Sequence, residues 1–294
     1  VTLSITTPEG ATLTCTSNPL AASSGVASFA GCKIDKAGTY TLTAKDGSLT
    51  SATSSSLTIT VGTAASLTLG ASSTTPGAGE ADNLTITALD AGGNVATTYS
   101  GVHELTFSGA SAIGSNNPTV SNSSGTATNF GTKTAISFSS GVATVKETTK
   151  NGVLRLYKAE SAKVVVSDGT INNGTGLSIT VSTGTASTMA FVNCSVGAEN
   201  CSGQPISVGN NSDMTFNMQT QDSFGNPSAP TSALSITFTN SDGTFSITAG
   251  EPAKITAPAT TSGSVTLHHG VNGGTNTLTA KASGFANVTL TAKK

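Results

Sequence analysis

Apolar and polar residues alternate along many short stretches of this chain. Residues 82–90 (DNLTITALD) place Leu84, Ile86 and Ala88 on one side, and residues 213–222 (DMTFNMQTQD) repeat the pattern. A period of two residues is typical of a β-strand with one buried face. Further candidate strands are residues 134–147, 152–161, 162–169 and 263–270. No amphipathic stretch at helical spacing lasts three turns, so the pattern predicts an all-β protein.

The spacing of these strands predicts the architecture. They follow one another at intervals of about 8–12 residues and are separated by Gly, Asn and Ser, which is typical of β-sandwiches. A length of 294 residues allows two or three domains of about 100 residues each. We therefore expect a tandem array of sandwich domains.

Two segments share one plan. Residues 88–110 and 219–241 each contain a strand that ends in Asp, two further residues, Gly-Asn, a short polar stretch and a second strand. The Asp side chains are expected to act as turn formers by accepting hydrogen bonds from backbone amides just beyond the strand. The residues of these two turns are Asp90, Gly93 and Asn94, and Asp222, Gly225 and Asn226.

A second repeated plan marks the domain boundaries. Residues 57–71 and 177–193 both consist of a closing strand, a Gly-Thr-Ala link and an opening strand. We therefore divide the chain into module 1 (residues 1–61), module 2 (residues 62–183) and module 3 (residues 184–294).

Module 1 aligns only with the later half of the other modules. Its opening residues, VTLSI, match the second strand of the repeat, and residues 38–61 match the closing strands. The opening strand and the strand before the Asp turn are missing. A sandwich that lacks a central strand exposes its core and unpaired backbone groups. We expect strands from an upstream segment or from another copy of the chain to complete module 1, since strand addition joins subunits tightly.

Composition narrows the classes of partner. Charged residues make up 10% of the chain, whereas Ser and Thr together number 93. The net charge of −2, with Arg155 as the single arginine, excludes an electrostatic footprint for nucleic acid or an anionic membrane. No apolar run reaches the 18 or so residues that a spanning helix needs. The lack of an initiator Met and of a signal peptide indicates a processed or excised piece.

The repeated turns DAGGN and DSFGN, together with the closing-strand segments, resemble the tandem immunoglobulin-like repeats of large bacterial surface and secreted proteins. The broader relatives are the invasin- and intimin-type modules, and the resemblance covers essentially the whole chain. It implies β-sandwich modules displayed outside the cell, in stalks, adhesins or filaments. It brings no catalytic residue and no cofactor to this sequence.

The four cysteines form two close pairs. Cys15 and Cys32 flank a predicted hairpin or pair of strands, and Cys194 and Cys201 enclose a short loop. An even count paired within modules favours two disulfides in an oxidising compartment. A metal site and free thiols are the alternatives, although neither pair has the C-x2-C spacing or a nearby His.

Candidate chemistry is sparse. His103 precedes a predicted strand, while His268 and His269 should point to opposite faces of one, so we interpret all three as surface or edge residues. The acidic residues are too scattered for paired-carboxylate catalysis or for calcium. Lys158 near Glu160 leaves open an isopeptide crosslink, although a solvated Lys is the ordinary interpretation.

Seven Asn-x-Ser/Thr triplets are candidate N-glycosylation sites. Several are expected by chance in a chain this rich in Asn, Ser and Thr, and O-linked sugar is an open alternative. The triplets begin at Asn83, Asn122, Asn173, Asn193, Asn200, Asn210 and Asn287.

Three functions follow from these observations. The favoured one is a non-catalytic array of modules in an extracellular filament, fibre or cell-surface stalk that binds other copies of itself. The alternative is an adhesin segment that binds a ligand, a surface glycan or a receptor. Sugar platforms rely on exposed aromatic rings, and here there is no Trp. Tyr40 and Tyr157 are expected on strands, which leaves Tyr99 as the loop candidate. Nothing positive supports an enzyme.

Overall fold

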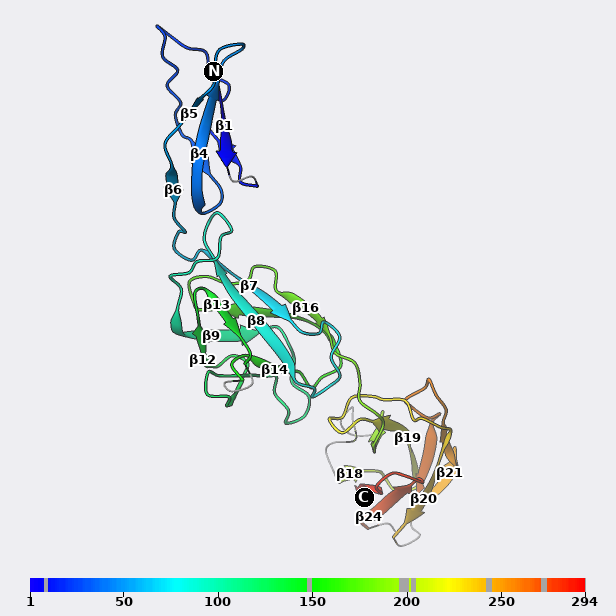
Figure 1. The fold of residues 1–294 in the computed structure, drawn as a ribbon. Helices are drawn as coiled ribbons and strands as arrows, with labels where there is room; N and C mark the ends of the chain where they lie inside the picture. Colours follow the sequence, from blue (N-terminus) through cyan, green and yellow to red (C-terminus); the bar gives the residue numbers. More distant parts are fainter. Residues whose placement is uncertain are drawn as a thin grey trace.

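The computed structural model describes residues 1–7, 10–146, 150–195, 201, 205–241, 245–270 and 274–293. The expected all-β fold is confirmed, because these residues form strands and loops with no helix among them. Within this described part, no helix has the length and apolarity needed to cross a membrane. Figure 1 shows the strands gathered into three bodies that follow one another along the chain.

Module 1 contains one main sheet, because all its longer strands pair with β4. The sheet has the order β1-β4-β5, and β6 also pairs with β4; a separate two-stranded ladder joins β2 to β3. The strands are β1 (Thr2–Thr7), β2 (Leu13–Thr14), β3 (Lys33–Ile34), β4 (Gly38–Lys45), β5 (Ala52–Thr53) and β6 (Leu57–Ile59).

Module 2 has two sheets that face each other. The opening sheet has the order β11-β10-β14-β8-β13, with β7 paired to β8, and the closing sheet has the order β12-β9-β15-β16. The strands are β7 (Ser66–Ala71), β8 (Asp82–Leu89), β9 (Gly101–Ser108), β10 (Thr119–Ser121), β11 (Ala127–Asn129), β12 (Lys133–Phe138), β13 (Val142–Thr144), β14 (Val153–Arg155), β15 (Ser161–Ser167) and β16 (Leu177–Thr180).

Module 3 repeats this layout with sheets of order β17-β19-β23-β21 and β18-β25-β24-β20-β22. Its central strand β19 pairs with β17 and β23, as β8 pairs with β7 and β13 in module 2. The strands are β17 (Thr188–Val192), β18 (Ile206–Ser207), β19 (Ser212–Gln221), β20 (Leu234–Asn240), β21 (Phe245–Ala249), β22 (Ala253–Ile255), β23 (Val265–His269), β24 (Asn276–Lys281) and β25 (Val288–Lys293).

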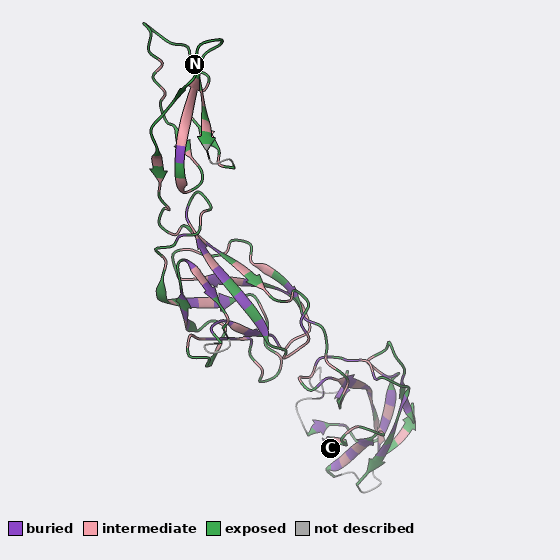
Figure 2. Cartoon of the chain, in the orientation of Figure 1, coloured by how far each residue is buried: buried purple, intermediate pink, exposed green. Residues whose placement is uncertain are grey.

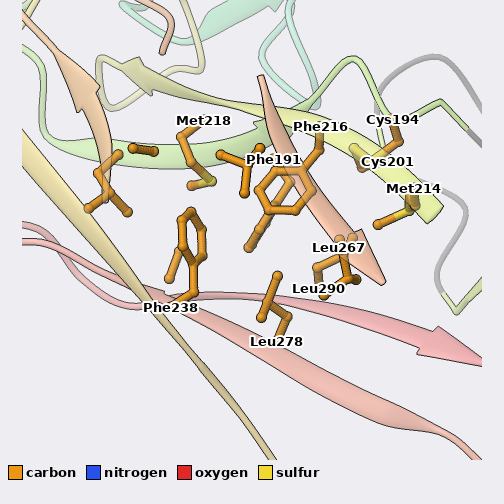
Figure 3. Close-up of a cluster of buried hydrophobic side chains, with 14 of the residues drawn as sticks. Phe191, Cys194, Cys201, Met214, Phe216, Met218, Phe238, Leu267, Leu278 and Leu290 are labelled. Carbon is orange, nitrogen blue, oxygen red and sulfur yellow. A yellow bond between two sulfur atoms is a disulfide. The ribbon is translucent and has the colours of Figure 1, made fainter. Parts of the chain in front are cut away.

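The alternating apolar residues of modules 2 and 3 meet between the two sheets as closed cores. In module 3 the ring of Phe216 lies edge-on to Phe191 and Phe238, with centroids 5.1 and 5.5 Å apart (Figure 3). Met214 and Met218 flank Phe216 on the same face of β19 and are fully buried. Burial of such side chains is the main favourable term in folding a sandwich.

Module 1 has no comparable core. Among the described residues of 1–61, only Tyr40 is buried, and neither buried cluster of the protein includes a residue of this module. Figure 2 shows the strands of module 1 mostly in the colours of intermediate and exposed residues. Val26 and Leu49 are 63% and 68% exposed. The apolar residues of β1, β4 and β6 therefore alternate as in the other modules, but apart from Tyr40 they are not buried as their counterparts in modules 2 and 3 are.

Two strand predictions are wrong in their extent. The predicted range 134–147, of which residue 147 lies outside the described residues, contains two strands, β12 and β13, which belong to opposite sheets and are separated by a turn at Ser140, with φ +50°. Residues 152–161 are mostly loop: β14 ends at Arg155, and β15 begins at Ser161. Tyr157 consequently lies in a loop rather than on a strand.

Candidate functional site

The Asp-x-x-Gly-Asn turns lie at the two places where one module meets the next. In module 2 the carboxylate of Asp90 caps its own turn: Oδ1 accepts hydrogen bonds from the backbone N–H groups of Gly92 and Asn94 at 2.9 and 2.8 Å. Gly93 has φ +82°, a left-handed conformation that favours glycine. The Asn94 amide also donates to both oxygens of Asp90 at 3.1 Å. The carboxylate thus fixes the orientation of the Asn side chain.

The oriented Asn94 side chain crosses into module 1. Its Oδ1 accepts a hydrogen bond from the N–H of Ala37 at 3.0 Å, and its Nδ2 donates to the carbonyl of Asp35 at 3.1 Å. The second oxygen of Asp90 accepts the N–H of Gly62, in the link between the modules, at 2.9 Å. Turn, link and preceding module are therefore joined by one hydrogen-bonded unit, which we call the joint clasp.

The same clasp recurs between modules 2 and 3. Asp222 accepts the N–H of Gly184 at 2.9 Å. Asn226 accepts the N–H of Ala159 and donates to the carbonyl of Tyr157, both at 2.7 Å. Asp222 and Asn226 are each 1% exposed, so this second clasp is shielded from water and its hydrogen bonds are the stronger for it.

The link residues Gly62 and Gly184 lie close against the clasp aspartates. A Cβ atom at either position would lie 3.3 Å from the Cβ of Asp90 or Asp222, tighter than an ordinary contact. The Gly of each Gly-Thr-Ala link is thus the residue that contacts the Asp of the following turn.

An aromatic contact reinforces the second joint. The ring of Phe224 lies over Gly79, where a Cβ atom would come within 2.3 Å of the ring, and packs edge-on against Tyr157 at 5.2 Å. Gly79 belongs to the loop between β7 and β8, and Arg155 donates to its carbonyl at 2.6 Å. The first joint has Gly92 in place of Phe224, and a Cβ there would approach the Asp35 carbonyl to 2.8 Å.

Hydrogen bonding keeps both clasp carboxylates ionised. The backbone N–H of Gly62 is the main cause that lowers the pKa of Asp90, followed by the amides of Asn94. Burial acts to raise the pKa of Asp222, but donors from Asn226 and Gly184 outweigh it and the pKa is lowered. Across the described residues, no group of three or more His, Cys, Asp or Glu side chains is placed to hold a metal ion.

Both expected disulfides are present. Cys15 bonds to Cys32 directly beyond the β2–β3 ladder, with Cα atoms 3.9 Å apart. Cys194 bonds to Cys201, with Cα atoms 5.4 Å apart. No free cysteine occurs in the described chain.

The histidine predictions are partly wrong. His103 lies within β9 rather than before it, and its ring stacks on Tyr99 at 3.7 Å. His268 and His269 do point to opposite faces, but only His268 reaches the surface, where Nδ1 lies 2.7 Å from a carboxylate oxygen of Asp213. His269 is fully buried because it lies on the same inward face of β23 as Val265 and Leu267, and its Nδ1 lies 2.8 Å from the carbonyl of Val208.

Tyr99 is engaged within module 2. One face of its ring is covered by His103, the ring of Phe138 stands perpendicular to it with centroids 4.9 Å apart, and its hydroxyl donates to Asp168 at 2.8 Å. Burial and this carboxylate raise the pKa of Tyr99. A ring held in this way is a poor platform for a sugar, although a shallow hollow beside it includes Thr63.

Lys158 forms an ion pair with Glu160, at 3.3 Å between Nζ and Oε2. Glu160 also accepts the N–H of Ser111 at 2.6 Å, so this pair anchors the loop that carries the second clasp.

The glycosylation candidates differ in access and remain predictions. Asn173 is half-buried and bonds the backbone at Val164 and Val166, and Asn122 accepts the N–H of Thr126. Asn200 lies outside the described residues. The exposed candidates are Asn83, Asn193, Asn210 and Asn287.

Comparison with known proteins finds only distant structural likenesses. No known family profile and no curated protein matches the chain. Among solved structures, the Escherichia coli adhesin FdeC is 16% identical with a TM-score of 0.36, over 100% of this chain and 86% of that one. The Yersinia pseudotuberculosis adhesin InvE is 16% identical with a TM-score of 0.29, over 77% of this chain and 58% of that one.

A β-glycosidase from Bacteroides vulgatus is similar to a like degree: 12% identity and a TM-score of 0.31, over 78% of this chain and 24% of that one. This chain therefore spans about a quarter of the glycosidase and just over half of InvE. Likenesses this weak carry no argument about function, since adhesins and a glycosidase occur together among them.

Proposed function

We propose that this chain is a non-catalytic rod segment of an extracellular filament, fibre or cell-surface stalk, whose joint clasps hold successive modules in fixed orientations. The observation that carries the proposal is the recurrence of one clasp at both joints. Each joins an Asp carboxylate, a link glycine and an Asn side chain that bonds two backbone groups of the preceding module. Linkers without such contacts leave modules free to reorient.

Two further features support a position outside the cell. Both cysteine pairs are oxidised, which suits secreted and surface proteins. Solubility rests on hydroxyl groups rather than charge, with 93 Ser and Thr residues against 10% charged residues. Other copies of the chain are the partners we propose.

The proposal includes completion of module 1 by strands from an upstream segment or from a neighbouring copy. Its support is the half-exposed apolar residues of β1, β4 and β6, beside which the described part of module 1 has only the two-stranded β2–β3 sheet.

Small-angle X-ray scattering tests the rod. We expect the 1–294 protein to give the long maximum dimension of an end-to-end array. Replacement of both clasp side chains (Asn94→Ala with Asn226→Ala) should broaden the distance distribution while circular dichroism stays unchanged. Asn287→Ala, at an exposed position outside both joints, is the matched control. A wild-type profile typical of one globular particle would contradict the proposal.

A further inference from the structure

The chain enters and leaves module 2 through two segments that lie side by side and run in the same direction. After β7, residues 74–78 lie along residues 180–182, which follow from β16 and lead into the link at Gly184. We call these two segments the parallel pair. Its backbone hydrogen bonds run from the N–H of Thr180 to the carbonyl of Thr74 (2.8 Å), from Ser182 to Pro76 (3.0 Å) and from Ala78 to Ser182 (2.9 Å).

Module 3 repeats this arrangement. β18, which follows β17 in the chain, pairs in parallel with β25, the counterpart of β16. The N–H of Val208 donates to the carbonyl of Lys293 at 2.8 Å. A proline stands in both modules where the chain crosses from the first sheet to the second, at Pro76 and Pro205. Proline has no N–H to donate, which suits a position where one strand ladder is left and another begins.

Apolar side chains shield these bonds from water. In module 2 Pro76 and Val181 are buried, and in module 3 Val208 and Ala292 are 0% and 2% exposed. A hydrogen bond in such surroundings is stronger than one in water. The parallel pairing is therefore built into the edge of each core and is not a loose contact between loops.

The two segments of module 2 are loaded in opposite directions when the ends of the module are pulled apart. β7 starts beside the first clasp, because its first residue pairs with Leu89, next to Asp90. Gly184 lies against the second clasp. Tension pulls residues 74–78 toward module 1 and residues 180–182 toward module 3, along the axis that the segments share. Bonds that cross this axis are strained together, whereas strands separated at neighbouring ends lose their bonds one after another.

We infer that the parallel pair is a mechanical lock, which keeps module 2 folded when the array is pulled from end to end. The inference rests on the proposed function, since a stalk or filament carries tension along its length. The entering and leaving segments are bonded directly to each other, so load passes between them without crossing the rest of the core. Module 2 therefore opens only when the bonds of the parallel pair break together.

Single-molecule force spectroscopy of the 1–294 protein tests the lock, because forced unfolding reports the unfolding rate. Handles at the exposed positions Thr63→Cys and Thr183→Cys load module 2 alone. Ala78→Pro removes one donor of the pair, and we expect unfolding at constant force to become about 10-fold faster, the effect of one backbone hydrogen bond. Ser123→Pro is the matched control: it removes the N–H that donates to Ala135, off the load path, and should leave the rate unchanged.

A second measurement needs no proline variant. Handles at Thr63→Cys and Ala91→Cys, both exposed, pull β7 from β8 at neighbouring ends, so their bonds break in succession. Module 2 should then unfold at a lower force than with the first pair of handles. If the first proline variant does not fold by circular dichroism, Ser182→Pro, which removes another donor of the pair, replaces it.

Two results would overturn the lock. These are equal unfolding forces in the two pulling directions, and an equal change of the unfolding rate in the variant of the parallel pair and in its control. Scattering tests the rod without load and depends on the clasps, so the lock and the rod proposal can fail separately.

Discussion

At the residue scale, the clasp depends on carboxylates that stay charged. The folded pKa of Asp222 is lowered, so its contribution to stability is fully present above the unfolded value of about 3.9 and is lost as pH falls through the folded pKa. We therefore expect the distance distribution from scattering to be unchanged between pH 7 and pH 5 and to broaden below about pH 4. Asp90→Asn together with Asp222→Asn should remove that transition, since both clasp carboxylates have a lowered pKa, whereas Asp46→Asn, at an exposed position, should keep it. A transition centred above pH 5 would contradict this assignment.

A second prediction at this scale concerns the aromatic contact of the second joint. Gly79→Ala adds a Cβ atom 2.3 Å from the Phe224 ring and strains a backbone with φ +76°. We expect a loss of stability of about 2–4 kcal/mol by urea denaturation, from overpacking plus left-handed strain. Gly114→Ala is the matched control, because its φ of +56° gives similar strain with open space around it.

Adding Phe224→Ala separates the two causes. The double variant should recover the overpacking part of the loss but not the strain, a coupling that a double-mutant cycle measures. Equal losses for Gly79→Ala and Gly114→Ala would show that the ring contact has no effect.

At the scale of strands and loops, the period of two predicted those strands in which every second residue is apolar and buried. β8 and β19 follow the expected ranges closely, because each is the central strand of a sheet. The strand prediction for residues 152–161 failed because the backbone groups of Tyr157 and Ala159 form hydrogen bonds with Asn226 of the next module and not with a neighbouring strand. His269 was placed at the surface although it continues the apolar face of Val265 and Leu267, so the alternation along β23 already indicated that it is buried.

The sequence contains a sign of the clasp: the Asn at the fifth position of each repeated turn, which the chemistry of the turn does not explain. Asp and Gly suffice to form the turn, so a repeated Asn at the fifth position has another role. The Lys-Ala pair at residues 36–37 and 158–159 repeats at the matching loops. The sequence alone does not connect the repeated Asn with the repeated Lys-Ala pair. The Asn side chain forms its hydrogen bonds with backbone groups, which any residue type can supply.

The disulfide of module 1 leads to a prediction about the β2–β3 ladder. Cys15–Cys32 ties the β2–β3 ladder in a module without a closed core, and a loop of this length contributes about 3 kcal/mol in the chain-entropy model. Reduction should therefore expose residues 10–34 to protease before module 2, which has no cysteine, is affected. Uptake of iodoacetamide by Cys15 or Cys32 without prior reduction would contradict the pairing.

At the scale of the whole molecule, the proposed rigidity of the joints would come from the hydrogen bonds of the two clasps. Both oxygens of each clasp carboxylate already accept hydrogen bonds from amide groups. A calcium ion at a module junction would need several such oxygens free to coordinate it. We therefore expect the maximum dimension from scattering to be the same in EDTA and in millimolar calcium, and to differ little between low and high salt, since the second clasp is buried. A chain that extends only with calcium would show that the joints are held by metal and not by Asp and Asn side chains.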